Sequence, residues 1–403
     1  MANFQAHKIG MKRFFALFKH RYRIGIPRRK QIVIYPEGKS TEILLTYLDA
    51  KKTSVFSPFG NEINVLVLLR MLVGGRVSRF DYLVSYLKCT KPTLVITTSD
   101  NDINFYRLKS IFPEMKTVAI QNGVRGNAST QPNESFFDLL KAESSSAKLS
   151  ADFVCTFGTA VQQEYRKHID GQFIAIGNLR NNFYNNALVK EEVDLLVYIS
   201  GLSGYPKDSR KTFYFFRDTA ISYKDFYAAE LHACSLLIDY CKRNNLRIVI
   251  CGKQNSTDTE ERRFYTDRLG SETPAIQSRD KTFDSYELLS KARLIVSLDS
   301  TVAYEFMSRG KRSAFVGARL NGLLSDNLLA TSGCTFGFPA DLPKSGSFWS
   351  SMLTQSEIDR ILNYARRATD KEWTETVAPI TELLMAYDPG NTKLQKLICE
   401  LTN

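Results

Sequence analysis

The chain has 403 residues and a formal net charge of +12, with 43% hydrophobic and 24% charged residues. Its length exceeds the size at which a single hydrophobic core usually stops growing, so we expect two domains, each with a large buried core. Seven cysteines are scattered without paired metal-binding spacing, which favours free thiols in a reducing compartment over a disulfide framework. No apolar run approaches the roughly 18 residues needed to cross a bilayer, so the sequence predicts a soluble or peripheral protein.

Residues 1–30 form a basic arm. They include nine lysines and arginines and no acidic residue, interleaved with bulky apolar side chains. Interfacial membrane helices combine these two features, and anionic lipid attracts each basic residue near its surface by roughly 1 kcal/mol. We therefore expect the arm to bind an anionic membrane surface, with a solvated tail as the alternative. Nucleic acid is not an expected partner, because no recognisable nucleic-acid-binding module follows.

The chain after the arm alternates apolar runs with amphipathic stretches, which is the pattern of βα units built around parallel sheets. In the first half the predicted strands are 32–35, 54–57, 94–97, 118–121, 153–157 and 173–176. The predicted helices between them are 40–49, 62–73, 103–111, 135–141 and 160–168. This half is expected to form a Rossmann-like layer.

A second α/β series follows. Its predicted strands are 195–199, 247–251, 294–298 and 313–316, and its predicted helices are 226–244 and 285–291. Residues 201–223 are predicted to be a long polar loop, and loops of that length in compact domains are usually functional or disordered. Three C-terminal helices are predicted at 356–368, 371–387 and 392–401. The predicted organisation is a basic arm (1–30), an N-terminal Rossmann-like acceptor domain (31–190), a C-terminal Rossmann-like donor domain (191–345), and C-terminal helices (346–403) able to cross back to the first domain.

Residues 294–312 carry the most informative local pattern. A buried strand ends at Leu298, Asp299-Ser300-Thr301 provide an N-cap, and a helix follows that stops at Gly310. The N–H groups and the dipole at such a helix start bind anions, and two hydroxyls there add hydrogen bonds to a phosphate. The pattern predicts a phosphate site for a nucleotide or nucleotide sugar, with a plain capped helix as the alternative. Two α/β layers with this motif late in the second describe the GT-B architecture, in which the ligand lies in the cleft between the halves.

Several short motifs between residues 30 and 320 resemble those of bacterial surface-carbohydrate biosynthesis proteins. They are Asp100-Asn101 with Phe105-Tyr106-Arg107, Gln121-Asn122-Gly123-Val124-Arg125-Gly126, Gly177-Asn178-x-x-Asn181-Asn182, Phe226-Tyr227-x-x-Glu230, Ile250-Cys251-Gly252-Lys253, and Asp299-Ser300-Thr301-x-x-Tyr304-Glu305-x-x-x-Arg309-Gly310-Lys311. More distantly, the second half resembles the β-Kdo and sialic-acid transferases of capsule and lipopolysaccharide assembly, which use a CMP-activated sugar. The resemblance implies a GT-B glycosyltransferase at the cytoplasmic face of the inner membrane, acting on a lipid-linked glycan acceptor with no metal or other cofactor.

The late motif is the expected donor site. Asp299, Ser300 and Thr301 are expected at the leaving phosphates, and Glu305, one turn further along the helix, at the ribose hydroxyls. The donor site is also expected to include Gly252, Lys253 and Arg309. Capping of the helix C-terminus is the alternative role of Arg309.

Two acidic residues are catalytic candidates, because glycosyl transfer passes through an oxocarbenium-like state that a nearby carboxylate stabilises. Glu230 opens a helix and, by the resemblance, is matched to the acidic nucleophile of the β-Kdo transferases; complementing the helix dipole is its alternative role. Asp100 is a candidate base on the acceptor side of the cleft. Asp100-Asn101-Asp102 also has the D-x-D form of a metal site, which its early position disfavours, and an Asx turn is the alternative. Acceptor hydroxyls are expected to be bound by Gln121, Asn122 and Arg125, unless these residues form only a turn.

The leading prediction is therefore a glycosyltransferase. CMP-Kdo or another CMP-ulosonic acid is preferred as its donor over a UDP- or GDP-hexose. The His-Pro pair of several sialyltransferase families is absent, which weakens a sialic-acid assignment. A nucleotide-sugar epimerase or hydrolase of the same architecture is the second hypothesis, and a non-catalytic polysaccharide-assembly or nucleic-acid-binding protein is the third. An oxidoreductase is disfavoured, because no G-x-G-x-x-G follows the first strand.

Overall fold

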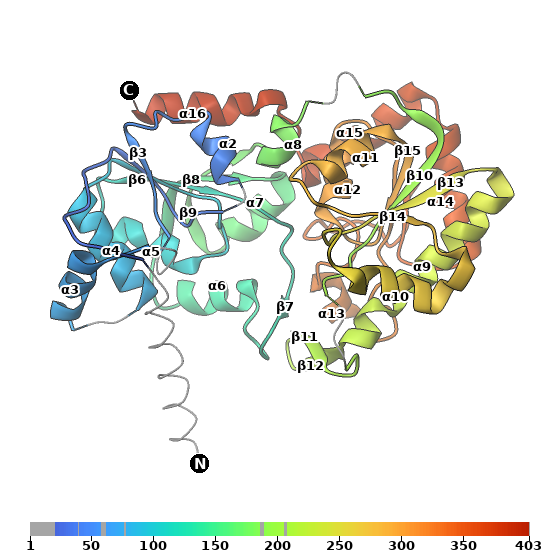
Figure 1. The fold of residues 1–403 in the computed structure, drawn as a ribbon, viewed down its shortest axis with the longest axis horizontal. Coiled ribbons are helices and arrows are strands. Elements are labelled where there is room, and N and C mark those ends of the chain that lie inside the picture. The colour runs from blue at the N-terminus through green and yellow to red at the C-terminus, as the bar shows by residue number, and fades with distance from the viewer. Residues whose placement is uncertain are drawn as a thin grey trace, which may run out of the picture.

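A computed structural model describes residues 21–402, apart from 39, 58–61, 76–77, 186–188 and 205–207. Residues 1–20 of the predicted basic arm, with most of its aromatic side chains, lie outside the described residues. Within the described part, no helix combines the length and apolar character needed to cross a membrane. Figure 1 shows two α/β halves side by side, each with its own sheet.

The first half is built on a six-stranded sheet in the order β3-β2-β5-β6-β8-β9, with every neighbouring pair parallel. Its strands are β2 (Ile32–Ile34), β3 (Thr53–Val55), β5 (Leu94–Thr97), β6 (Lys116–Ile120), β8 (Leu149–Thr156) and β9 (Ile169–Ala175). Each strand was predicted at this place in the chain, to within a few residues at its ends. Buried parallel strands are continuous apolar runs, and such runs are visible in the sequence.

Alternate side chains of this sheet belong to two different cores, as the two-residue repeat of a strand requires. Val33, Val95 and Ala119 pack in one core with side chains of α3 (Val65–Val73), α4 (Arg79–Thr90), α5 (Ile103–Ile111) and α7 (Thr159–Arg166). Ile34, Ile96 and Ile120 pack in the other with α2 (Thr41–Leu45), α8 (Leu179–Phe183) and the last helix of the chain, α16 (Thr392–Thr402). Helix α16 therefore lies on the first half, as Figure 1 also shows.

The remaining elements of the first half are short. They are β1 (Arg21–Arg23), β4 (Glu62–Asn64), β7 (Ala128–Ser129) and α6 (Phe136–Ser144). The predicted helix 62–73 thus begins three residues late, because β4 pairs with β1 and Asn64 caps α3 by accepting from the Val67 N–H. Helix α4 was not predicted.

The second half has a six-stranded parallel sheet in the order β14-β13-β10-β15-β16-β17. Its strands are β10 (Glu192–Ile199), β13 (Arg247–Cys251), β14 (Ala275–Gln277), β15 (Ala292–Ser297), β16 (Ser313–Val316) and β17 (Trp349–Ser350). Numbered along the chain this is the order 3-2-1-4-5-6 of a Rossmann fold, whose direction reverses between β10 and β15. Strands β14 (Ala-Ile-Gln) and β17 (Trp-Ser) were not predicted, because neither is an apolar run.

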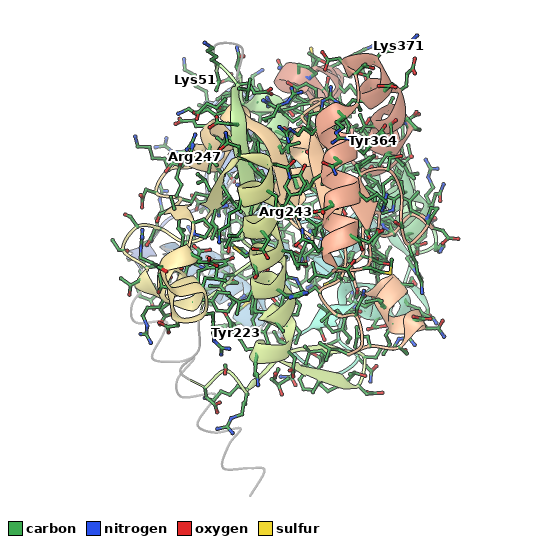
Figure 2. The ribbon with its side chains drawn as sticks, turned by 90° about the vertical axis from the view of Figure 1, so that its right-hand side faces the viewer. Lys51, Tyr223, Arg243, Arg247, Tyr364 and Lys371 are labelled. Carbon is green, nitrogen blue, oxygen red and sulfur yellow. The ribbon has the colours of Figure 1, made fainter. Side chains whose placement is uncertain are left out.

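Helices pack against the second sheet. Figure 2 shows α9 (Tyr223–Asn244), with Tyr223 and Arg243 near its ends, alongside α14 (Gln355–Arg367), which carries Tyr364. An ion pair between Arg243 of α9 and Asp359 of α14 joins these two helices at 2.7 Å. The other helices of this half are α10 (Thr259–Leu269), the 3-10 turn Gly270–Glu272, α11 (Asp284–Lys291), α12 (Thr301–Ser308), α13 (Asp326–Thr331) and α15 (Asp370–Leu384). The 3-10 turn Pro389–Asn391 packs against the first half, where the Asn391 side chain donates to the Leu179 carbonyl at 3.0 Å.

The two halves are joined by backbone contacts as well as by the chain crossings. The predicted loop 201–223 contains a hairpin of β11 (Thr212–Phe216) and β12 (Thr219–Ser222), and β11 pairs with β7 of the first half. The Asn127 N–H donates to the Thr331 carbonyl at 3.1 Å. At Gly126 a side chain cannot fit, because a Cβ there would lie 2.1 Å from the carbonyl oxygen of Ser332. These contacts close one side of the junction and place the two sets of strand ends opposite each other.

Candidate functional site

The switch in strand direction between β10 and β15 creates a crevice beyond their carboxyl ends, which is where ligands bind in open α/β sheets. A cavity of about 350 Å³ lies there. From the second half it is lined by residues that follow β10, β13 and β15, among them Gly201, Lys253 and Ser300. From the first half it is lined by Asn122 and Arg180. The cavity therefore lies between the two halves.

One wall of the cavity is the start of helix α12. Ser300 is its N-cap residue, but the Ser300 side chain makes no capping hydrogen bond. Instead the Ser297 hydroxyl accepts from the Ser300 N–H at 2.9 Å and fixes the turn. Ser300, Thr301 and Val302 all line the cavity, so the first turn of the helix and its two hydroxyls are presented to it. A helix start with its dipole and N–H groups directed at a cavity favours an anion.

A buried arginine that was not predicted holds this turn in place. The Arg319 Nε donates to Asp299 at 2.6 Å, and its terminal nitrogen donates to Glu230 at 2.7 Å. The Arg319 guanidinium also lies over the Phe226 ring, 4.8 Å from the centroid. The two carboxylates raise the pKa of Arg319 against the opposing effect of burial. Arg319 follows strand β16, so the rule that parallel strand ends converge on one edge of a sheet would have placed it near the site.

Glu230 lies beneath the cavity rather than in its lining. Its side chain is fully buried, and both carboxylate oxygens are engaged. One oxygen accepts from Arg319, and the other accepts from the Gly201 N–H at 2.7 Å and from the Tyr265 hydroxyl at 3.3 Å. Glu230 is therefore not among the residues that line the cavity, and its role as nucleophile or base stays a prediction. Its observed contacts position Arg319 and the backbone after β10.

Basic groups also line the cavity. Lys253 and Arg279 come from loops of the second half, and Arg180 comes from helix α8 of the first half. Burial lowers the pKa of Lys253, and the nearby Asp299 carboxylate acts in the opposite direction. Arg279 and Arg180 were not predicted. Arg279 lies in a polar connection and Arg180 in the short helix α8, and a lone arginine gives no distinctive pattern in either.

The backbone of Lys253 is fixed by a buried carboxylate. The Lys253 N–H donates to Glu261 at 3.0 Å, and the Ser200 hydroxyl donates to the same carboxylate at 2.6 Å. The adjacent Gly252 lies against this group, and a Cβ there would be 2.8 Å from a Glu261 oxygen. Gly252 and Lys253 were both predicted in the donor site. The structure places Lys253 at the cavity and gives Gly252 a steric reason to be glycine.

Glu305 lines the cavity from the second turn of α12. The Tyr286 hydroxyl donates to its carboxylate. Burial raises the pKa of Glu305 to about 7, in spite of the opposing effects of Tyr286, Arg180 and Arg309. Near neutral pH the cavity therefore contains a carboxyl group that is only partly ionised.

Arg309 is directed away from the cavity, contrary to its predicted place in the donor site. Its Nε donates to the Asn181 side chain at 2.6 Å, and a terminal nitrogen donates to the Tyr184 carbonyl at 2.6 Å. Both partners belong to the end of the first half. Arg309 therefore joins the two halves, which is a structural role that helix spacing alone does not reveal.

The predicted acceptor residues form a compact cluster at the strand ends of the first sheet. Asp100 is fully buried, pairs with Arg125 and accepts from the Tyr165 hydroxyl at 2.6 Å. Asp100 is therefore engaged within this cluster and does not line the cavity, and its role as a base stays a prediction. Gln121 is also buried and accepts from the Phe157 N–H at 2.7 Å, so it braces a neighbouring loop. Of this cluster, Asn122 reaches the cavity.

The Asp100-Asn101-Asp102 sequence is engaged in local structure. Asp102 caps α5 by accepting from the Asn104 N–H at 3.1 Å, and its other oxygen accepts from the Tyr35 hydroxyl at 2.6 Å. These contacts agree with the Asx-turn alternative. In the described ranges no group of three or more histidine, cysteine or acidic side chains is arranged to hold a metal ion.

The model of a protein family described as "putative O-antigen biosynthesis protein" matches residues 118–402. The chain belongs to this family. The matched segment contains every residue that lines the cavity, from Asn122 to Arg319. A comparison with curated proteins gave no match.

Two solved structures share the arrangement of both halves. Sucrose-phosphate synthase from Thermosynechococcus elongatus is 14% identical, with a TM-score of 0.50, and the match covers 93% of this chain and 99% of that one. A "putative UDP-N-acetylglucosamine 2-epimerase" from Listeria monocytogenes is 11% identical, with a TM-score of 0.50, and the match covers 92% of this chain and 96% of that one. At these identities the likeness concerns the fold. It confirms the predicted GT-B architecture of two Rossmann-like halves with C-terminal helices.

Proposed function

We propose that this O-antigen biosynthesis protein is a glycosyltransferase that transfers a sugar from a nucleotide-sugar donor to a lipid-linked glycan. The observation that supports this most strongly is the cavity at the β10–β15 switch point, which is lined by the start of helix α12 together with Lys253 and Arg279. A helix start and basic side chains around one cavity provide the stabilisation that a departing nucleotide phosphate requires.

The cavity holds an excess of basic side chains, which suits an anionic donor. Lys253, Arg180 and Arg279 are opposed by Glu305, and Arg319 shares its charge between Asp299 and Glu230. A CMP-activated ulosonic acid and a UDP-hexose both carry two negative charges at neutral pH. We infer a CMP-ulosonic acid such as CMP-Kdo as the donor, which follows from the sequence resemblance, and a direct comparison of nucleotides tests this choice.

The side chains can be given roles in donor binding. Ser300 and Thr301 donate hydrogen bonds to the leaving phosphate, and Lys253 supplies charge to the same group. Glu305 accepts hydrogen bonds from the ribose hydroxyls, with its position fixed by Tyr286. This arrangement supplies charge stabilisation from the protein, so we propose that no metal ion is needed.

The acceptor is proposed to enter from the first half, where Asn122 and Arg180 border the cavity. A lipid-linked acceptor would place the protein at the cytoplasmic face of the inner membrane. The basic residues of the arm are suited to hold it there.

A thermal-shift panel of CMP, UMP, UDP and GDP, each with and without EDTA, tests the proposal. A nucleotide that binds the folded state raises the apparent stability in proportion to RT ln(1 + [L]/Kd), and EDTA is expected to leave the shift unchanged. Ser300→Ala should weaken binding of the responding nucleotide by about 1–3 kcal/mol. Ser235→Ala, at an exposed position of α9, should leave that binding unchanged. The absence of any shift across the panel would contradict the proposal. If a donor is consumed and free sugar accumulates without an acceptor product, the protein is a hydrolase instead.

A further inference from the structure

Helix α3 exposes an apolar face. Leu66, Leu69 and Val73 are 38%, 51% and 90% exposed and are spaced by three and four residues, which places them on one side of a helix. The opposite side, with Val67 and Met71, is buried in the first core. Scattered single apolar side chains on a surface are ordinary, but a continuous stripe usually marks a binding surface. Figure 1 shows α3 at the outer end of the first half, far from the second half.

Two further apolar side chains lie beside the start of this helix. Strand β1 pairs in parallel with β4, with Arg23 opposite Asn64, so the segment after β1 leaves the sheet next to α3. The Asn64 side-chain amide donates to the Gly25 carbonyl at 2.9 Å and holds the two together. In this segment Ile24 is 85% exposed and Ile26 is 78% exposed. The apolar surface therefore extends from α3 onto residues 24–26.

Basic residues border this surface. Arg23, Arg28, Arg29 and Arg70 are all exposed. Next to it a cavity of about 1010 Å³ is lined by Arg23, Arg28 and Lys30, with Glu37 as its acidic residue. Apolar side chains bordered by arginines match the boundary between the acyl chains and the phosphates of an anionic bilayer.

We propose that this docking surface, formed by Ile24, Ile26, Leu66, Leu69 and Val73 with Arg23, Arg28, Arg29 and Arg70, binds the surface of an anionic lipid bilayer. The apolar side chains enter the headgroup region and the arginines contact lipid phosphates. The docking surface belongs to the folded first half and does not rely on residues 1–20. None of its residues lines the donor cavity, so its test is independent of the proposed transferase activity.

Co-sedimentation of the full chain with vesicles of 70% phosphatidylcholine and 30% phosphatidylglycerol tests the proposal. The apolar part is tested by Val73→Glu, with Val193→Glu as the matched control, because Val193 is also an exposed valine (78%) but lies in the second half. The charged part is tested by Arg28→Gln with Arg29→Gln, and its control is the exposed pair Arg262→Gln with Arg263→Gln on α10.

We expect Val73→Glu to reduce vesicle binding at least tenfold, and the Arg28/Arg29 variant to reduce it about 30-fold, the equivalent of about 2 kcal/mol for two basic residues. Both controls should bind like the wild type, and pure phosphatidylcholine vesicles should bind the wild type weakly. Melting temperature and nucleotide binding, measured on each variant, confirm that the fold is retained. Equal binding of Val73→Glu and Val193→Glu would overturn the proposal. A wild-type dimer that Val73→Glu dissociates, with vesicle binding unchanged, would also overturn it, because the surface would then bind a second copy of the chain.

Discussion

Replacing Arg319 with methionine should destabilise the second half severely. The Arg319 side chain is 1% exposed, and its partner Glu230 is fully buried, so the substitution leaves a buried carboxylate without its counter-charge. Breaking a buried ion pair by removing one partner costs about 3–5 kcal/mol. Methionine reproduces the aliphatic part of arginine but not the guanidinium that lies over the Phe226 and Tyr227 rings, so the loss includes these contacts as well as the charge.

Urea denaturation followed by tryptophan fluorescence is the appropriate assay, because the two tryptophans, Trp349 and Trp373, are both buried in the second half. Arg243→Met is the control: it breaks an ion pair whose side chains are 50% and 28% exposed, and such pairs contribute about 0–1 kcal/mol. The double variant Arg319→Met with Glu230→Gln should be more stable than Arg319→Met alone, because the buried charge is also removed. An Arg319→Met variant within about 1 kcal/mol of the wild type would refute this reasoning.

Two further predictions concern the same site. Because burial raises the pKa of Glu305 from 4.5 to about 7, the folded state binds this proton more tightly than the unfolded state; stability should therefore fall by about 3 kcal/mol as the pH rises from 4.5 to 7. Glu305→Gln should remove this fall. Identical pH profiles of the urea midpoint for the wild type and Glu305→Gln would show that Glu305 is not the group responsible. Gly252→Ala should cost about 1–3 kcal/mol, because its Cβ would lie 2.8 Å from a Glu261 oxygen. Urea midpoints measure this loss, and an unchanged midpoint would mean that Glu261 moves aside freely.

The sheets could be predicted from the sequence because buried parallel strands are short apolar runs followed by turns. Strands β5, β13 and β16 begin and end at the predicted residues. The β11–β12 hairpin could not be predicted in the same way, because β11 pairs with a two-residue strand of the other half. Helix α10 was missed because most of its side chains are polar and it buries few of them, so it lacks a clear apolar stripe.

The site was predictable to the extent that its signals are local. The turn of Asp299, Ser300 and Thr301 is a contiguous strand–turn–helix pattern, and the structure places all three residues at one cavity. The roles of Glu230 and Asp100 depended on partners elsewhere in the chain. Glu230 is paired with an arginine 89 residues away and Asp100 with one 25 residues away. An acidic residue in a motif gives no sign of whether such a partner neutralises it.

The central claim is that the cavity beside α12 binds the nucleotide phosphate of a sugar donor. Titration calorimetry of the nucleotide that responds in the thermal-shift panel, with wild type, Lys253→Gln and Lys224→Gln, tests it most directly. Lys253 lines the cavity, whereas Lys224 is an exposed lysine on α9 that does not. Losing a hydrogen bond to a charged group costs about 1.5–3 kcal/mol, so Lys253→Gln should weaken binding about 10- to 150-fold while Lys224→Gln leaves it unchanged. Equal affinities for all three proteins would contradict the account.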